Sequence, residues 1–305
     1  MTSRRKIRLF AGTSVISTES RKKDLELLNI FGYYSGVISD NASSADNQQE
    51  RPTFMWESSE TICRMSWVEN EYLASFLGFL YTDGCLSPKY KNSWRIYFGV
   101  KSKKLAEHFC NVSAKLFLIS ADRLKIRLTG RGIYTVVINS KEIGNFLYSN
   151  FGTFRTLKYS NGAITAADLP SSYLIDRSCI ESFLRSAFTC DGGVCFYPVT
   201  SKKHGTRWLN RNVFLACSHP VLRKSYKRLL EILGISSTNN VVDERIKISS
   251  REDIVKFRNR IGFLEGVEVT CHSRKWKNVP KTEVLDLLID SYGNTAKYLN
   301  QLQRQ

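Results

Sequence analysis

Two short segments of this chain resemble each other and share the same last two residues. Residues 76–84 read FLGFLYTDG and residues 184–192 read LRSAFTCDG, so both copies end in Asp-Gly. Around each copy, small residues recur at a spacing of four, namely Ala74, Gly78 and Thr82 in the first and Ser182, Ser186 and Cys190 in the second. On a helix this spacing forms a narrow stripe, and two such stripes let the helix backbones approach closely. The repeat therefore predicts two helices that pack side by side.

The aspartates that end the two segments, Asp83 and Asp191, are then expected at the same end of the helix pair. The glycine after each aspartate, Gly84 or Gly192, suits the point where a helix stops. An isolated Asp-Gly pair is more often a simple turn, but here it ends both small-residue stripes. Two adjacent carboxylates supply the hard oxygen ligands that divalent cations prefer. We therefore predict a divalent-cation site that both halves of the chain build.

The hydrophobic pattern around each motif predicts the same element order, α-β-β-α-β-β-α, and thus an α+β fold made by tandem duplication. We divide the chain into an N-terminal extension with a polar linker (1–65), a first repeat (66–151), a connector (152–175), a second repeat (176–265) and a C-terminal helical extension (266–305). Within these regions, strands are predicted over 123–128 and 241–248. One extra polar helix is predicted over 281–304.

The predicted strands of the first repeat have an apolar side and a basic side. The segment 123–128 places Arg123, Lys125 and Arg127 on one face without an acidic residue. A solvated sheet face usually mixes both charges, whereas an antiparallel ribbon fits the major groove of DNA. The residues that we predict to contact DNA are Ser87, Lys89, Lys91, Arg95, Tyr97, Arg123, Lys125, Arg127, Thr135, Tyr197, Lys202, Lys203, Arg207, Trp208, Asn210, Asn212, Arg245 and Lys247. Because the two repeats differ in these residues, the DNA target should be asymmetric.

Composition supports a polyanionic partner. The 305 residues include 45 Lys and Arg against 28 Asp and Glu, a net charge of +17, and each phosphate neutralised by such cations releases counterions. No apolar run approaches the ~18 residues that span a bilayer, and the N-terminus lacks the apolar core of a signal peptide, so we expect no membrane role. The eight cysteines form no Cys-x-x-Cys pair, which argues against a zinc ribbon and favours reduced thiols in a prokaryotic cytosol or an organelle matrix.

The two motifs resemble those of the LAGLIDADG homing endonucleases in their single-chain form. Three letters of the family's nine are identical in each copy; these are Gly78, Asp83 and Gly84 in the first and Leu184, Asp191 and Gly192 in the second. Ser186 replaces the middle glycine in the second copy. The resemblance covers roughly residues 70 to 265.

This resemblance implies a monomer in which the two repeats pack about a pseudo-two-fold axis, and their sheets form a saddle over double-stranded DNA. Asp83 and Asp191, with the main-chain carbonyls of Thr82 and Cys190, would hold Mg²⁺, and Ca²⁺ would be a non-catalytic substitute. The family cuts both strands and leaves short 3′ overhangs, which initiates intron homing. Lys101 occupies a position where the family often has a catalytic lysine, whereas the equivalent residue of the second repeat is Ser218.

Two other functions fit the same fold. One is an RNA maturase that assists splicing of an intron RNA, and the other is a DNA-binding regulator without catalysis. Both aspartates are present, and we therefore expect the endonuclease in preference to either alternative.

Overall fold

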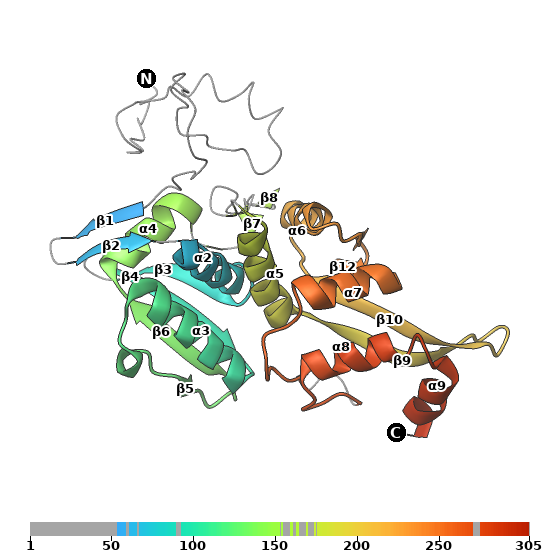
Figure 1. Cartoon of the computed structure of the whole chain (residues 1–305). Helices are drawn as coiled ribbons and strands as arrows, with labels where there is room; N and C mark the ends of the chain where they lie inside the picture. Colours follow the sequence, from blue (N-terminus) through green and yellow to red (C-terminus); the bar gives the residue numbers. More distant parts are fainter. Residues whose placement is uncertain are drawn as a thin grey trace, which may run out of the picture.

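Two successive repeats with the same element order form most of the molecule (Figure 1). The computed structural model describes residues 54–58, 61–65, 67–89, 93–152, 154, 159–160, 163–164, 169, 174, 176–270 and 275–304. The predicted polar linker over residues 35–52 lies outside this set. Within the described residues, no helix is long and apolar enough to cross a membrane.

The first repeat is a four-stranded antiparallel sheet with helices packed on its apolar face. Its elements are α2 (Trp67–Leu80), β3 (Gly84–Lys89), β4 (Ser93–Val100), α3 (Lys103–Phe117), β5 (Arg127–Leu128), β6 (Tyr134–Asn139) and α4 (Lys141–Phe151). The strand order is β3-β4-β6-β5. Ile96 and Phe98 of β4 are fully buried, and the Phe98 ring stacks on Phe109 of α3 at 4.4 Å. A short hairpin of β1 (Phe54–Ser58) and β2 (Thr61–Met65) precedes the repeat, within the segment that was assigned to the N-terminal extension.

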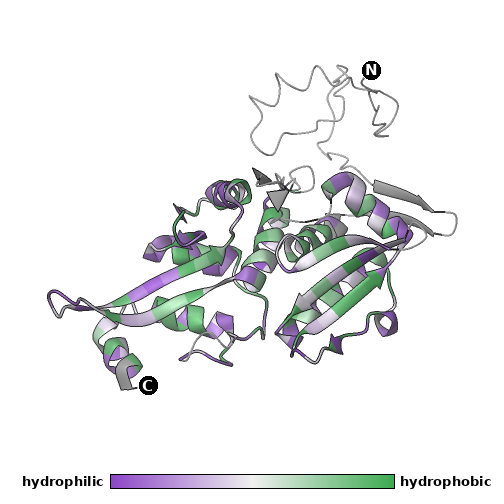
Figure 2. Cartoon of the chain, turned by 180° about the vertical axis from the view of Figure 1, so that it is seen from behind, coloured by the Kyte–Doolittle hydropathy of each residue, from purple (hydrophilic) through white to green (hydrophobic). Residues whose placement is uncertain are grey.

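The second repeat has the same topology with longer central strands. Its elements are α5 (Arg177–Asp191), β9 (Gly192–Thr200), β10 (Arg207–Ala216), α6 (Pro220–Ile232), β11 (Thr238–Asn240), β12 (Arg245–Ile248) and α7 (Arg251–Arg260). Its strand order, β9-β10-β12-β11, matches that of the first repeat. The short strands β7 (Tyr159–Ser160) and β8 (Ala163–Ile164) lie in the connector. The predicted α+β duplication is therefore confirmed. Figure 2 shows apolar residues on the strands and central helices and hydrophilic residues on the loop between β9 and β10.

Two predicted strands are shorter than expected. In place of a strand over 123–128, a 3₁₀ turn (Ala121–Arg123) precedes the two-residue strand β5. The reason is that Leu124 turns into the core, with 7% of its surface exposed, so the chain joins the sheet only where Arg127 pairs with Thr135. The strand over 241–248 was also wrong, because a turn occupies 241–244 and Glu244 has a positive φ of 51°.

The prediction of one polar helix over 281–304 was wrong as well. Two helices, α8 (Lys281–Asp290) and α9 (Thr295–Arg304), occupy this region, and the apolar residues of α8 are buried, including Val284, Leu285 and Leu288. Both helices pack on the back of β9 and β10. Arg211 of β10 donates hydrogen bonds to Ser291 Oγ at 2.7 Å and to Thr295 Oγ1 at 2.7 Å, which ties the C-terminal extension to the second sheet.

Helices α2 and α5 lie side by side between the two sheets (Figure 1), as the small-residue stripes predicted. A Cβ atom added to Gly78 would lie 2.4 Å from the Phe183 carbonyl oxygen and 2.8 Å from Ser186 Cβ. One step along the interface, the hydroxyls of Ser75 and Ser186 share a buried hydrogen bond of 2.7 Å. The two backbones are therefore in direct contact at Gly78.

We expect Gly78→Ala to lower the free energy of unfolding by about 1–3 kcal/mol, because the added methyl group has no space against the α5 backbone. Helix propensity alone would give the opposite sign, a gain of about 1 kcal/mol. The matched control is Gly130→Ala, since a Cβ atom at Gly130 meets nothing within 4 Å. Urea unfolding of both variants decides the point, and a stabilised Gly78→Ala protein would contradict the close packing.

Candidate metal centre and nucleic-acid interface

The close packing of α2 and α5 brings Asp83 and Asp191 together. The helical hydrogen bonds of α2 continue to Asp83, whose N–H donates to the Phe79 carbonyl at 3.1 Å, and Asp191 is the last residue of α5. Gly192, after the second aspartate, is extended (φ −101°) and not left-handed as a helix-ending glycine often is. Glycine is needed there because a Cβ atom would lie 2.5 Å from the Phe188 carbonyl oxygen.

Burial makes ionisation of both aspartates less favourable, and the charge of Asp83 adds to this effect at Asp191. Surrounding protein atoms remove water from the Asp191 carboxylate, and the nearby charge of Asp83 adds to this effect, so the pKa of Asp191 rises to about 7. Desolvation also raises the pKa of Asp83, although a hydrogen bond from Cys190 and the charge of Lys281 oppose that rise. Asp83 is half-buried and Asp191 remains exposed, so a ligand can reach the pair.

The donor set of this pair fits a hard divalent cation. Two carboxylates lie at two helix C-termini, where the last carbonyl groups lack intrahelical donors and the helix dipoles are negative. Thr82 turns its hydroxyl back onto the Gly78 and Phe79 carbonyls, at 3.0 Å each, so its own main-chain carbonyl is the group predicted to bind a metal. Among the described residues, no group of three or more His, Cys, Asp or Glu side chains could hold a metal ion. Mg²⁺ is nevertheless commonly bound by one or two carboxylates together with water and substrate phosphates.

The cysteine beside Asp191 is part of the same cluster. Burial raises the pKa of the Cys190 thiol well above its usual value, and the negative charge of Asp83 raises it further. The thiol is therefore neutral and donates its hydrogen bond to Asp83. A neutral thiol stabilises the ionised form of this carboxylate without adding a charge of its own.

Lys281 is the functional candidate that the sequence did not reveal. Only 7% of its surface is exposed, and its ammonium group donates hydrogen bonds to the carbonyls of Thr189 (2.6 Å) and Gly192 (2.7 Å), which flank Asp191. Burial lowers the pKa of Lys281 to about 8, although the nearby acidic groups, Cys190 in its ionised form and both aspartates, oppose this change. No repeat pattern could have identified it, because Lys281 lies outside both repeats, at the start of α8.

The predicted catalytic lysine, Lys101, lies directly after β4 and is exposed. The cation whose charge lowers the pKa of Asp83 and Asp191 is Lys281 and not Lys101. In the second repeat, the carbonyl of Ser218 accepts a hydrogen bond from Arg223 at 3.4 Å. The catalytic role of Lys101 stays a prediction.

The open face of the first sheet gathers the predicted basic residues into one groove. This groove has a volume of about 340 Å³ and is lined by Lys89, Arg95, Arg123, Lys125, Arg127, Thr135, Val137 and Asn139. None of these residues is acidic. Register places Ser87 opposite Arg95 on the same face, and the Arg95 guanidinium lies 5.6 Å from the centre of the Tyr97 ring. The cluster forms although most of 123–128 is not strand. Lys91 lies outside the described residues.

The predicted contact residues on the strands of the second sheet share one face, apart from Arg207 at the start of β10. Register places Tyr197 opposite Asn210 and Cys195 opposite Asn212. Tyr197 and Trp208 have 44% and 46% of their surfaces exposed. At the tip of the β9–β10 hairpin, Lys202, Lys203 and Arg207 are exposed. On the neighbouring strand β12, Arg245 lies over the Phe214 ring at 4.7 Å, and Lys247 forms an ion pair with Asp243.

The raised pKa of Asp191 predicts a stability effect that does not depend on DNA. The folded-state pKa of about 7 exceeds the ordinary value of 3.8, so the wild-type protein loses stability as the pH rises between these two values. In EDTA, we expect Asp191→Asn to raise the melting temperature at about pH 8 and to have much less effect at about pH 4. Replacement of the exposed Asp290 by Asn is the control. A pH-independent effect of Asp191→Asn would contradict the crowded carboxylate pair.

Part of the chain matches a known family model, and a curated protein is similar in sequence. Residues 178–262 match the family model of the LAGLIDADG-like domain. The match lies within the second repeat, and it confirms the family resemblance recognised in the sequence. A curated relative, the replication factor C small subunit of Methanocaldococcus jannaschii, is 24% identical over 194 residues, which are 64% of this chain. The matched segment is 10% of the length of that relative.

Solved structures with a similar fold include I-DmoI in complex with its target DNA in the presence of manganese. It is 18% identical, with a TM-score of 0.44, over 64% of this chain and 94% of that one. The I-LtrWI LAGLIDADG homing endonuclease bound to target DNA is 12% identical, with a TM-score of 0.46. The match covers 77% of this chain and 96% of that one. The N-terminal LAGLIDADG domain of WhiA is 16% identical, with a TM-score of 0.38. The match covers 65% of this chain and 85% of that one.

Proposed function

We propose that this protein is a site-specific homing endonuclease that uses Mg²⁺ to cut both strands of a long asymmetric DNA site, leaving short 3′ overhangs. The observation that carries the proposal is the carboxylate pair. Asp83 and Asp191 come from different repeats and converge at one end of the α2–α5 pair, where Lys281 lies buried beside them. Because one chain supplies both halves of the centre, a monomer is sufficient.

The residues of the centre have separate tasks in this proposal. Asp83 and Asp191, with the carbonyls of Thr82 and Cys190, would hold the cation. A bound Mg²⁺ activates water and neutralises charge on the phosphoryl group. Lys281 fixes the main chain on both sides of Asp191 through its two hydrogen bonds. Its positive charge also keeps both carboxylates more readily ionised, and therefore able to bind a cation.

The two open sheet faces would hold the DNA on either side of the metal centre. Lys and Arg side chains that line the first groove suit phosphate oxygens and the major-groove edge of guanine. Contacts to phosphates position the duplex, whereas contacts to base edges select the sequence. A natural role in intron homing follows from the same activity, and the target gene would then be the intronless allele of the host gene.

The function can be tested by incubating the purified protein with Mg²⁺ and DNA of candidate intronless host genes, followed by mapping of the cut ends on each strand. Staggered double-strand cuts at one site support the proposal. Tighter binding to the host intron RNA than to any DNA would favour the maturase instead. Sequence-specific DNA binding without cleavage would favour a regulator.

Binding should depend steeply on salt, because the log of the affinity falls by about 0.9 per phosphate neutralised for each unit of log salt. A slope shallower than about −3 would argue against an extended DNA track. Replacing Arg123, Lys125 and Arg127 together by Ala should reduce the slope by about two to three. Lys103→Ala is the control. This exposed lysine begins α3, which packs on the other face of the first sheet, and the lysine forms an ion pair with Glu107. An equal slope in all three proteins would show that the groove does not face DNA.

A further inference from the structure

The open face of the second sheet is electrically different from that of the first. The first groove gathers five cationic side chains without an acidic neighbour in its lining. On the strands of the second face, the cations are Arg245 and Lys247, and both are engaged within the protein. Arg245 lies over the Phe214 ring at 4.7 Å, and Lys247 pairs with the Asp243 carboxylate. The centre of the second face therefore carries fewer cations than the first groove, and a carboxylate offsets one of them.

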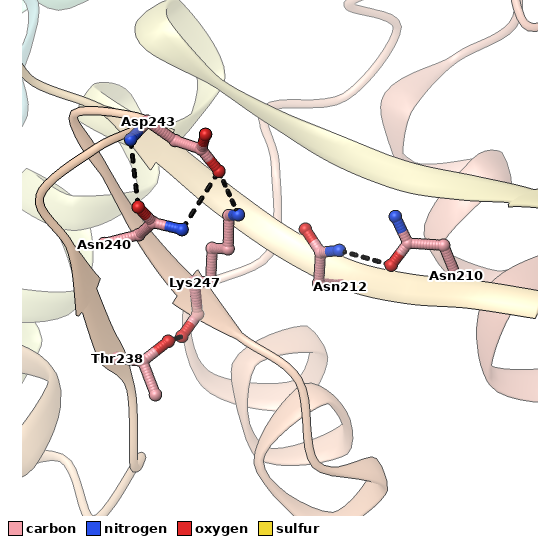
Figure 3. A network of polar contacts seen from close by, with 6 residues as sticks. All are labelled: Asn210, Asn212, Thr238, Asn240, Asp243 and Lys247. Carbon is pink, nitrogen blue, oxygen red and sulfur yellow. Dashed lines mark hydrogen bonds and ion pairs between the residues drawn. The ribbon is translucent and has the colours of Figure 1, made fainter.

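A small polar network holds the Asp243 carboxylate in place (Figure 3). The Asp243 N–H donates to Asn240 Oδ1 at 2.9 Å, and Asn240 Nδ2 donates back to Asp243 Oδ2 at 3.0 Å. On the neighbouring strand, the Thr238 hydroxyl donates to the Lys247 carbonyl at 3.4 Å. Because the turn itself fixes Asp243, the pairing with Lys247 is built into the fold.

Next to this network, two asparagines on β10 present unused hydrogen-bonding capacity (Figure 3). Asn212 Nδ2 donates to Asn210 Oδ1 at 2.9 Å. This bond leaves Asn210 with its amide N–H donors. Asn212 has only 6% of its surface exposed, and its Oδ1 is a buried acceptor without a hydrogen-bond partner among the described residues. Asn212 therefore positions Asn210, whose half-buried amide is the group that a base edge can reach.

We propose that the second sheet reads A·T base pairs and the first sheet reads G·C base pairs, so that the two halves of the DNA target differ in composition. In the major groove, an asparagine amide matches the N6 and N7 atoms of adenine, and apolar side chains contact the thymine methyl group. Arginine and lysine match the O6 and N7 atoms of guanine. The amide of Asn210, held by Asn212 and flanked by Tyr197 and Trp208, fits the first chemistry, whereas the cations of the first groove fit the second. This inference rests on the proposed DNA-binding function.

Asp243 has a defined part in this discrimination. Lys247 lies opposite Phe214 in the register of β10 and β12. Asp243 forms an ion pair with the ammonium group of this lysine. Without Asp243, that lysine would be available to guanine and to any phosphate. The aspartate thus offsets one of the two positive charges on the A·T-reading face and lowers its non-specific affinity.

The experiment selects bound molecules from a pool of random-sequence duplex DNA, with the full-length protein in Ca²⁺, and sequences the selected pool. The wild-type protein should enrich a bipartite site with A·T pairs in one half and G·C pairs in the other. Asn210→Ala should reduce base discrimination roughly ten-fold at one or two positions of the A·T half only. Arg127→Ala, the matched variant of the first sheet, should relax the G·C half only. Asp243→Ala should weaken A·T selectivity and raise affinity for unselected DNA.

Three results overturn the inference. They are a selected site whose halves have the same composition, an effect of Asn210→Ala in the G·C half, and an unchanged profile in both asparagine and aspartate variants. Asn212→Ser replaces the buried residue as a second test if Asn210→Ala is poorly folded. A failure of the proposed function looks different, because the wild-type protein would then enrich no DNA sequence at all.

Discussion

Replacing either Asp83 or Asp191 by Asn is expected to abolish double-strand cleavage, while the affinity for the DNA target stays within a few-fold of wild type. The chemistry needs both carboxylates as cation ligands, whereas binding depends on phosphate and base contacts from the two sheets. Asparagine preserves the shape of each side chain but removes the charge. Cleavage of a labelled target by each variant in Mg²⁺, with binding measured in Ca²⁺, separates the two effects.

The control for this prediction is Asp290→Asn, which removes an exposed carboxylate of α8 that lies outside the metal centre and the two sheet faces. It should still cut. Cleavage at the wild-type rate by Asp83→Asn or Asp191→Asn would disprove the assignment of the metal centre. A loss of both binding and cleavage would point to misfolding, which a melting curve of the same sample detects.

Lys281→Met should slow cleavage by on the order of 10²-fold or more at neutral pH, because a preorganised positive charge at such a centre contributes at least this much. Methionine fills a similar volume, so the packing of α8 is retained. The charge of Lys281 lowers the pKa of both aspartates. Its loss should therefore raise these pKa values and move the pH dependence of cleavage upward. The rate should recover partly as the pH increases, which a purely structural role of Lys281 does not predict.

The comparison with Lys101→Ala and Ser218→Ala tests the two candidate lysines against each other. If Lys101 assists the cleavage of one DNA strand, Lys101→Ala should slow the cutting of that DNA strand more than the other. Ser218→Ala should have little effect. A nicking assay on supercoiled plasmid with each strand labelled measures both rates. Equal and minor effects of Lys101→Ala and Ser218→Ala would leave Lys281 as the basic residue of the centre.

The central helices were predictable from the sequence because their packing requires a local pattern. Small residues at a spacing of four are needed wherever two backbones touch, and Gly78 and Ser186 meet that need. The carboxylate pair followed from the same pattern, since each stripe ends at an aspartate. For Gly192, the prediction that the helix ends at a glycine was correct, but the physical reason differs. Glycine is required because its backbone lies close to Phe188, and not because the backbone is left-handed.

Lys281 was not predictable because its position depends on tertiary structure alone. A lysine at the start of a helix usually lies in solvent, and nothing near position 281 indicates that α8 buries it against Thr189 and Gly192. The strand predicted over 123–128 failed for a related reason. Alternation of Arg and Lys with apolar residues predicts a strand, but the core contact of Leu124 determines the local path. Arg123, Lys125 and Arg127 nevertheless line the same groove.

The most direct measurement of the central claim is metal-dependent cleavage of the DNA that the protein itself selects. The selected duplex is incubated with the wild-type protein in Mg²⁺, Ca²⁺ or EDTA, and the ends are mapped on both strands. We predict staggered cuts with short 3′ overhangs between the two half-sites in Mg²⁺ only. Intact DNA in Mg²⁺, under conditions where the protein is fully bound to its site, would contradict a catalytic centre at Asp83 and Asp191.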